Sequence, residues 1–282
     1  MEQPSSPSAS SSLAFRRVAF PRERRLVLDT LRLGHNKPMM HGLLELDVTL
    51  ARRMLREHRD RTGESLSFTA FVLACLGRAV AAHPEVHAIR DWFGRMVLFK
   101  DVDATTIVEV KVDGRPFALA HVVRGINRRS AGDIHDEIRS VQTSGMRSLP
   151  SVIRVGSRLF LMLPGFLRRL VYRALLRFPQ LAKRHTGTML VTAVGMFSSG
   201  PGWGFSAPGI HNLSIVVGGI APRPPTVAGE SEPREVLFLT VSANHDMVDG
   251  APLARFARDF TRRLESAEGL ADSIAQRVSV TT

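Results

Sequence analysis

The sequence has one cysteine, one tyrosine and two tryptophans among its 282 residues. The single cysteine, Cys75, lies in the apolar run FVLACL, so no intramolecular disulfide can form and a reducing, cytoplasmic location is expected. A buried thiol of this kind is usually inert. The sequence also lacks any uninterrupted apolar stretch of roughly 20 residues, the length that a membrane-spanning helix needs. We therefore expect no membrane-spanning segment.

The formal net charge of the chain is +12, and no acidic residue lies between Ser151 and His185. A strong positive charge is typical of proteins that bind nucleic acid when it spreads over one face. Here the excess of basic over acidic residues lies mainly in one segment, which argues against nucleic acid as a partner. The basic residues of this segment are Arg154, Arg158, Arg168, Arg169, Arg173, Arg177, Lys183 and Arg184.

The remaining composition indicates one globular domain. Residues 1–14 are mostly serine and proline, without the basic start and apolar core of a secretory signal, and predict a disordered tail. We place the domain at 15–265, with a basic amphipathic insert at about 151–185 and a C-terminal tail at 266–282. The hydrophobic content of 44% is sufficient for a sizeable core.

Helical and strand-like patterns are interleaved along this domain. The pattern predicts an α/β two-layer sandwich with a mixed β-sheet, without internal repeats. Asp113-Gly114 between two apolar runs indicates a hairpin, and Ser67 is placed to cap a helix. Expected helices cover 22–33, 50–60, 68–82, 126–143 and 249–265, and expected strands cover 41–49, 187–197, 213–221 and 235–243.

The stretch SANHDMVDGAP carries the chemistry that the sequence suggests most directly. His245 follows an apolar strand, and an imidazole with a pKa near 6.5 can take a proton from a thiol or hydroxyl near neutral pH. Asp249 could orient this loop or a nearby arginine. The structural alternative is a turn that contains a histidine, with Asp249 as the N-cap of the next helix and Pro252 in its first turn.

Five ordered blocks carry a family resemblance, and their order and spacing are more specific than any one motif. From Arg17 to about Glu265 the chain resembles the catalytic domain of the dihydrolipoamide acyltransferases of 2-oxo acid dehydrogenase complexes, which is similar to chloramphenicol acetyltransferase. The blocks are RERRLVLDTL, LELDVT, LSFTAFVLACLGRAVAAHPEVHA, GTMLVTAVGMF and LTVSANHDMVDGAPLARFARDFTRRLE.

The resemblance implies a chloramphenicol acetyltransferase-like fold and an acyl transfer between coenzyme A and another thiol, in sites between the subunits of a homotrimer. His245 matches the family's general base, and Asp249 with Gly250 matches its Asp-Gly pair. Thr192 matches the hydroxyl that donates to the oxyanion of the tetrahedral intermediate. Residues that contact coenzyme A are not assigned, and no metal site is assigned.

Two departures accompany the resemblance. Asn244 and Asp246 flank His245 where the family commonly has Asp-His-Arg, so the electrostatics around the base differ. The block at Val110 to Val123 matches only loosely. The lipoyl and subunit-binding domains of complete family members are not found in the sequence. We expect a free-standing catalytic domain without a covalently bound lipoyl group, acting on acyl-coenzyme A and an unidentified acceptor.

The insert Leu163–His185 has three readings. Leu167, Leu170, Val171, Ala174, Leu175 and Phe178 share one side of the predicted helix, and Arg169, Arg173 and Arg177 line an adjacent edge. This helix could rest on an anionic membrane, bind an acidic carrier protein, or pack on its own domain with its arginines in water. For the whole chain, the alternative to an acyltransferase is a non-catalytic trimeric scaffold that retains the fold.

Overall fold

The structure is a computed structural model that describes residues 15–21, 24–112, 115–144, 159–195, 200–224 and 233–281. The expected tail at 1–14, the Asp113-Gly114 turn, and Arg154 and Arg158 of the basic insert lie outside these residues. Within them, no helix is both long enough and apolar enough to cross a membrane.

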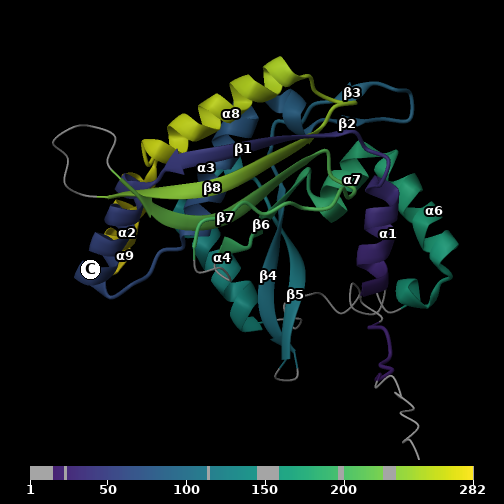
Figure 1. Ribbon diagram of the computed structural model, residues 1–282, viewed down its shortest axis with the longest axis horizontal. Helices are drawn as coiled ribbons and strands as arrows, with labels where there is room; N and C mark the ends of the chain where they lie inside the picture. Colours follow the sequence, from purple (N-terminus) through teal and green to yellow (C-terminus); the bar gives the residue numbers. More distant parts are fainter. Residues whose placement is uncertain are drawn as a thin grey trace, which may run out of the picture.

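A six-stranded mixed sheet forms the centre of the molecule, with the strand order β1-β8-β7-β6-β4-β5. The parallel pairs are β4–β6 and β6–β7, and the others are antiparallel (Figure 1). This confirms the α/β class with a mixed sheet. The strands are β1 (Met39–Asp47), β4 (Ala104–Val112), β5 (Arg115–Val123), β6 (Met189–Ala193), β7 (Leu213–Arg223) and β8 (Arg234–Asn244), and a small separate sheet holds β2 (Ile89–Arg90) and β3 (Met96–Val97).

Helices cover one face of the sheet and enclose the main core. Helix α3 is nearly surrounded by protein because its sequence FTAFVLACLGRAVAA is apolar on all sides. The Ser67 hydroxyl accepts the Ala70 N–H at 3.4 Å, which confirms the expected N-cap. The helices of this layer are α2 (Thr49–Thr62), α3 (Phe68–Ala82), α4 (Ala131–Ser144), α8 (Gly250–Glu265) and α9 (Leu270–Thr281), with short 3₁₀ turns η1 (Pro84–His87) and η2 (Ile126–Arg128).

Two regions differ from the sequence-based expectation. Residues 266–282 were expected to be a tail, whereas α9 occupies most of them and places Leu270 and Ile274 in the core. The Ala131 N–H also donates to the Ser273 hydroxyl at 3.1 Å, which ties α9 to α4. The helix expected at 126–143 begins only at Ala131, because a 3₁₀ turn precedes it.

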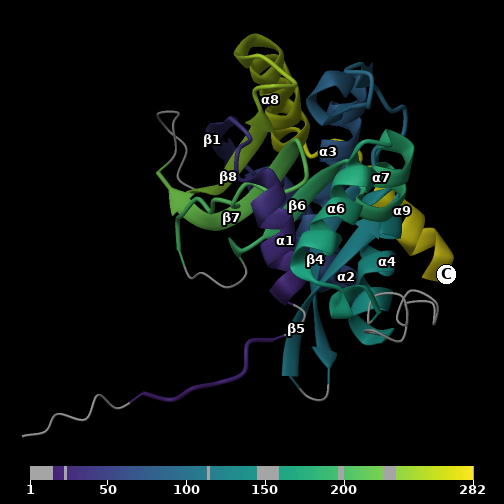
Figure 2. The same ribbon diagram turned by 90° about the vertical axis from the view of Figure 1, so that its right-hand side faces the viewer.

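A second group of helices lies at one end of the sheet, away from α2 and α9 (Figures 1 and 2). It consists of α1 (Arg24–Gly34), α6 (Gly165–Leu176) and α7 (Pro179–Thr186). A buried ion pair joins the first two, because Arg168 Nε donates to Asp29 Oδ2 at 2.6 Å and both side chains are almost fully enclosed. Leu170, Val171 and Phe178 of the predicted apolar side are exposed instead. The insert therefore packs through a charge pair and leaves apolar side chains on the surface.

Candidate active site

The loop after β8 presents His245 at one end of the sheet. Its imidazole is half-exposed, with 50% of the side chain accessible. The backbone around it is fixed: the His245 N–H donates to the Pro38 carbonyl at 2.8 Å, and the Met247 N–H donates to the Asn244 carbonyl at 3.0 Å. A solvent-accessible imidazole on a held loop is a suitable arrangement for a proton acceptor.

Asn244, directly before the histidine, is the buried anchor of this loop. Its N–H donates to the Asn212 carbonyl at 2.8 Å, and its side-chain amide donates to Asn212 Oδ1 at 3.2 Å. The Asn244 Oδ1 atom in turn accepts the Asp246 N–H at 3.1 Å. Asn244 therefore joins the histidine loop to the loop before β7, a role for which its amide has both a donor and an acceptor.

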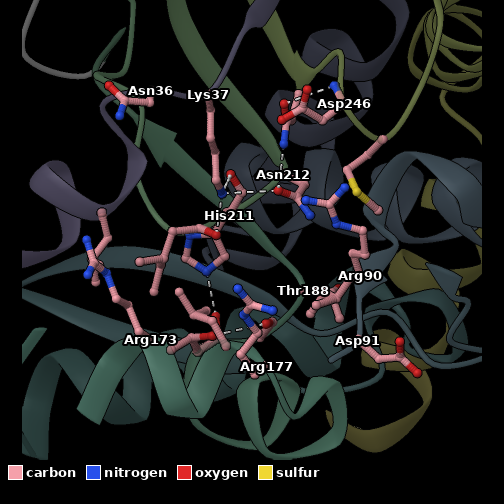
Figure 3. Close-up of a pocket in the computed structure, with 18 of the residues that line it drawn as sticks. Asn36, Lys37, Arg90, Asp91, Arg173, Arg177, Thr188, His211, Asn212 and Asp246 are labelled. Atoms are coloured by element: carbon pink, nitrogen blue, oxygen red, sulfur yellow. Dashed lines mark hydrogen bonds between the residues drawn. The ribbon is translucent and has the colours of Figure 1, made fainter. Parts of the chain in front are cut away.

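Lys37, from the chain segment before β1, binds the loop before β7, as Figure 3 shows. Its ammonium donates to the carbonyls of Ile210 and His211 at 2.6 and 3.0 Å and to Asn212 Oδ1 at 3.0 Å. Burial lowers the pKa of Lys37 from 10.5 to about 8, although the nearby Asp246 carboxylate acts in the opposite direction. All three ammonium donors are used, so this lysine is a structural cation close to the proposed base.

Asp249 lies at the N-cap position of α8, but its side chain makes no capping hydrogen bond. The structural alternative is therefore right about the N-cap position but wrong about a capping hydrogen bond from the carboxylate. Instead Asp249 Oδ1 lies 3.6 Å from His245 Nδ1, with 83% of the aspartate side chain exposed. This separation is too long for a hydrogen bond. Gly250 begins the helix without a positive φ.

Thr192 lies on β6, half-buried in a cavity of about 430 Å³ that does not include His245. Hydroxyl groups of Ser67, Thr69 and Thr106 line this cavity together with apolar side chains such as Ile138. Within the described part of the chain, the Thr192 hydroxyl has no hydrogen-bond partner, so it remains able to donate to a ligand.

One chain does not bring His245 and Thr192 together. Strand register places Thr192 level with Val216 and Thr240, and His245 follows Thr240 by five residues. The offset is about 17 Å along the strands and about 10 Å across two of them, or about 20 Å in total. Reacting groups must approach to about 3 Å, so the two residues of one chain cannot act on the same carbonyl.

A second cavity, of about 410 Å³, adjoins the histidine loop and was not foreseen from the sequence (Figure 3). Asn244, Asp246 and Met247 line it at the end of the sheet where β6 and β7 begin and β8 ends. Its walls also carry a group of cationic side chains, namely Arg32, Lys37, Arg90, Arg173 and Arg177. The i, i+4 spacing of Arg173 and Arg177 was visible in the sequence, but their meeting with Arg32 and Arg90 depends on tertiary packing.

Comparison with known proteins gives the family context of this site. Residues 149–271 match the model for the 2-oxoacid dehydrogenases acyltransferase (catalytic domain). The sequence resemblance is confirmed. A search of curated proteins gave no match.

Solved structures extend the likeness in fold to almost the whole chain. A probable dihydrolipoamide acetyltransferase from Listeria monocytogenes has a TM-score of 0.67 at 15% identity, covering 91% of this chain and 97% of that one. The Azotobacter vinelandii dihydrolipoamide acetyltransferase gives the same TM-score and identity, with 93% and 97% covered. The cubic core of a pyruvate dehydrogenase multienzyme complex has a TM-score of 0.66 at 15% identity, again with 93% and 97% covered. The fold is therefore that of the acyltransferase cores.

Proposed function

We propose that this protein is an acyltransferase that moves an acyl group between coenzyme A and a thiol or other nucleophilic acceptor. The observation that carries the proposal is the half-exposed His245 imidazole, held on a fixed loop beside a basic cavity in the fold of acyltransferase cores. The study of the Azotobacter enzyme concerned the catalytic roles of a serine, a histidine and an asparagine, the last two spaced by four residues. His245 and Asp249 have the same spacing.

In the proposed reaction, His245 takes the proton of the acceptor thiol as the sulfur attacks the thioester carbonyl. The tetrahedral intermediate then expels the thiolate of coenzyme A, which takes the proton back from the imidazolium, so atoms and charge balance. The Asp249 carboxylate lies 3.6 Å from His245 Nδ1, at the other end of the same loop. Thr192 donates a hydrogen bond to the oxyanion.

The separation of about 20 Å supports a site between two subunits. His245 of one subunit would face Thr192 of the next, in a homotrimer that closes on itself. The same arrangement would bring the cavity around Thr192 to the reacting carbonyl. The non-catalytic scaffold remains the alternative, and a half-exposed imidazole together with an unpaired threonine hydroxyl favours the enzyme.

Replacing His245 by alanine tests the proposal. The His245→Ala variant should lose about 100- to 10,000-fold in kcat/KM with an acyl-coenzyme A donor, because the acceptor then has no general base. The Thr192→Ala variant should retain a measurable rate, with kcat lowered by about 100-fold and KM little changed, because one oxyanion donor is lost. Free thiol release measures both. A folded His245→Ala protein with most of its activity would contradict the mechanism.

We further propose that the insert Leu163–His185 contacts an anionic membrane surface. Phe166, Leu170 and Phe178 are exposed on it, and the described residues of the insert include no acid. The double variant Phe166→Ser/Leu170→Ser should reduce sedimentation with phosphatidylserine vesicles by about 10-fold while leaving kcat unchanged. Unaltered vesicle binding by this variant would contradict membrane contact. If the variant instead bound an acidic carrier protein more weakly than the wild type does, the carrier protein would be the partner.

A further inference from the structure

The four arginines of α6 and its C-cap divide into two groups with different surroundings. Arg168 and Arg169 both reach Asp29, at 2.6 and 3.4 Å, and fix α6 against α1. Arg173 and Arg177, one and two turns further along the same helix, line the cavity beside the His245 loop. The first pair is used in folding, so only the second pair is available to a ligand.

Two more arginines from other elements line this cavity, Arg32 from α1 and Arg90 from β2. Figure 3 labels Arg90 beside Arg173 and Arg177. Among the described residues, the side chains of Arg32, Arg90 and Arg173 make no hydrogen bond or ion pair with the protein. The guanidinium of Arg177 lies 5.0 Å from the ring centroid of Trp92, which holds it at the cavity rim without using its N–H donors on an acceptor.

The two carboxylates of the cavity do not neutralise these arginines. Asp91 accepts hydrogen bonds from the side chain and N–H of Arg95, within its own turn. The charge of the Asp246 carboxylate acts on the Lys37 ammonium, whose pKa it raises. Burial lowers the pKa of His211 to about 4, so this ring in the cavity wall is neutral near pH 7. Five cationic side chains therefore face two carboxylates, and the field inside favours an anion.

The position of this cavity indicates what kind of anion it would hold. It has a volume of about 410 Å³, which is within the range of sites for small organic ligands. Asn244 and Asp246 line it on either side of His245, whose own side chain is not part of the lining. An anionic group bound there would lie beside the loop that carries the proposed base, as expected for one end of the molecule on which His245 acts. Guanidinium groups from three separate elements suit phosphate oxygens, because each can donate two parallel hydrogen bonds.

We propose that this arginine cavity, formed by Arg32, Arg90, Arg173 and Arg177, binds the phosphate groups of a phosphopantetheine thiol that carries the acyl group. The inference rests on the proposed acyl transfer for the identity of the thiol. The phosphate could belong to free coenzyme A or to a phosphopantetheine arm on a carrier protein. In both cases the helix α6 of the insert supplies half of the arginines, which makes it a determinant of donor specificity.

Calorimetric titration with inorganic pyrophosphate tests the cavity without requiring activity. The Arg90→Ala and Arg173→Ala variants should each weaken pyrophosphate binding by about 10-fold, and the Lys replacements should recover part of it. Arg61→Ala is a matched control, since Arg61 is an exposed arginine on α2, in the other helix layer, outside the cavity. Equal pyrophosphate affinity in the wild type and both alanine variants would overturn the proposal.

Titrations of the thiols then distinguish the sources of the phosphate. If the cavity recognises coenzyme A, coenzyme A should bind more tightly than pantetheine. If it recognises the arm of a carrier protein, the phosphopantetheine-bearing carrier protein should bind more tightly than pantetheine. In either case Arg173→Ala should remove the difference in affinity. Pantetheine binding as tightly as both would overturn the inference. The proposed function is tested by a different experiment, the transfer of acetyl from thioesters that include acetyl-pantetheine, which lacks phosphate. If the wild-type protein binds pyrophosphate through these arginines but transfers no acetyl group from any thioester, only the acyl transfer is refuted.

Discussion

Lys37 shows how a single residue can support the candidate base without contacting a substrate. Its ammonium joins the chain segment before β1 to the loop that holds Asn212, and Asn212 in turn holds Asn244 beside His245. A buried cation in this position costs free energy, which is visible in its pKa of about 8. The cost is offset by three hydrogen bonds that hold the loop in place.

The lowered pKa of Lys37 gives a stability prediction. Between about pH 8 and pH 10.5 the unfolded chain holds a proton on this lysine that the folded chain has released. The free energy of unfolding contributed by Lys37 should therefore rise with pH across this window, by up to about 3 kcal/mol. Urea unfolding of the wild type and of Lys37→Met at pH 7.5 and pH 10 measures it. A difference between the two proteins that stays constant or moves in the variant's favour would contradict the lowered pKa.

Sequence alone suggested candidate residues in the histidine loop but not the residues that hold this loop in place. His245 was visible because it follows an apolar strand in a recognisable block. Lys37 and Asn212 are separated by 175 positions and meet only in the folded chain. Asp249 shows the opposite error, because its place before a helix predicted a cap, whereas its carboxylate is free of the helix and turned toward His245. Local patterns give the backbone position, but side-chain direction depends on neighbours distant in sequence.

At the scale of elements, the pairing of α1 with α6 positions two walls of the arginine cavity. Arg32 and Arg173 come from these two helices, and the Asp29–Arg168 ion pair fixes them together. The periodicity of α6 predicted an apolar packing side, but its single buried side chain is Arg168. Helix α9 was missed for a related reason, since two buried apolar residues, Leu270 and Ile274, are too few to distinguish a short helix from a tail by sequence pattern.

Removing one partner of this ion pair should destabilise the protein strongly. The Asp29→Ala variant leaves the Arg168 guanidinium buried without an acceptor for its charge, which should lower the free energy of unfolding by about 3–5 kcal/mol. The double variant Asp29→Ala/Arg168→Met should recover much of this loss, since no buried charge remains. Denaturant unfolding of the wild type and the two variants measures the loss and the recovery; adding the Arg168→Met variant gives the coupling energy. Equal stability of the single and double variants would show that Arg168 reaches solvent once Asp29 is absent.

At the scale of the whole molecule, the fold was the most predictable feature and the assembly is the least visible one. Interleaved helix and strand periodicities specify an α/β layer structure because each element must bury an apolar face. The 20 Å between His245 and Thr192 follows only from strand register. If His245 and Thr192 act on one carbonyl, as we propose, they must come from two different copies of the chain.

Mixed assemblies provide the decisive test of this subunit arrangement. His245→Ala subunits keep a functional Thr192, and Thr192→Ala subunits keep a functional His245. If each site combines His245 of one subunit with Thr192 of the next, random co-assembly at equal amounts should restore wild-type residue pairs in about a quarter of the sites. Co-expressed variants should then show about a quarter of the wild-type kcat, well above the average of the two variants assayed separately. If the site instead lay within one chain, no mixed assembly could contain an intact pair, and the activity would equal that average. A monomer by light scattering at micromolar concentration would likewise contradict the arrangement.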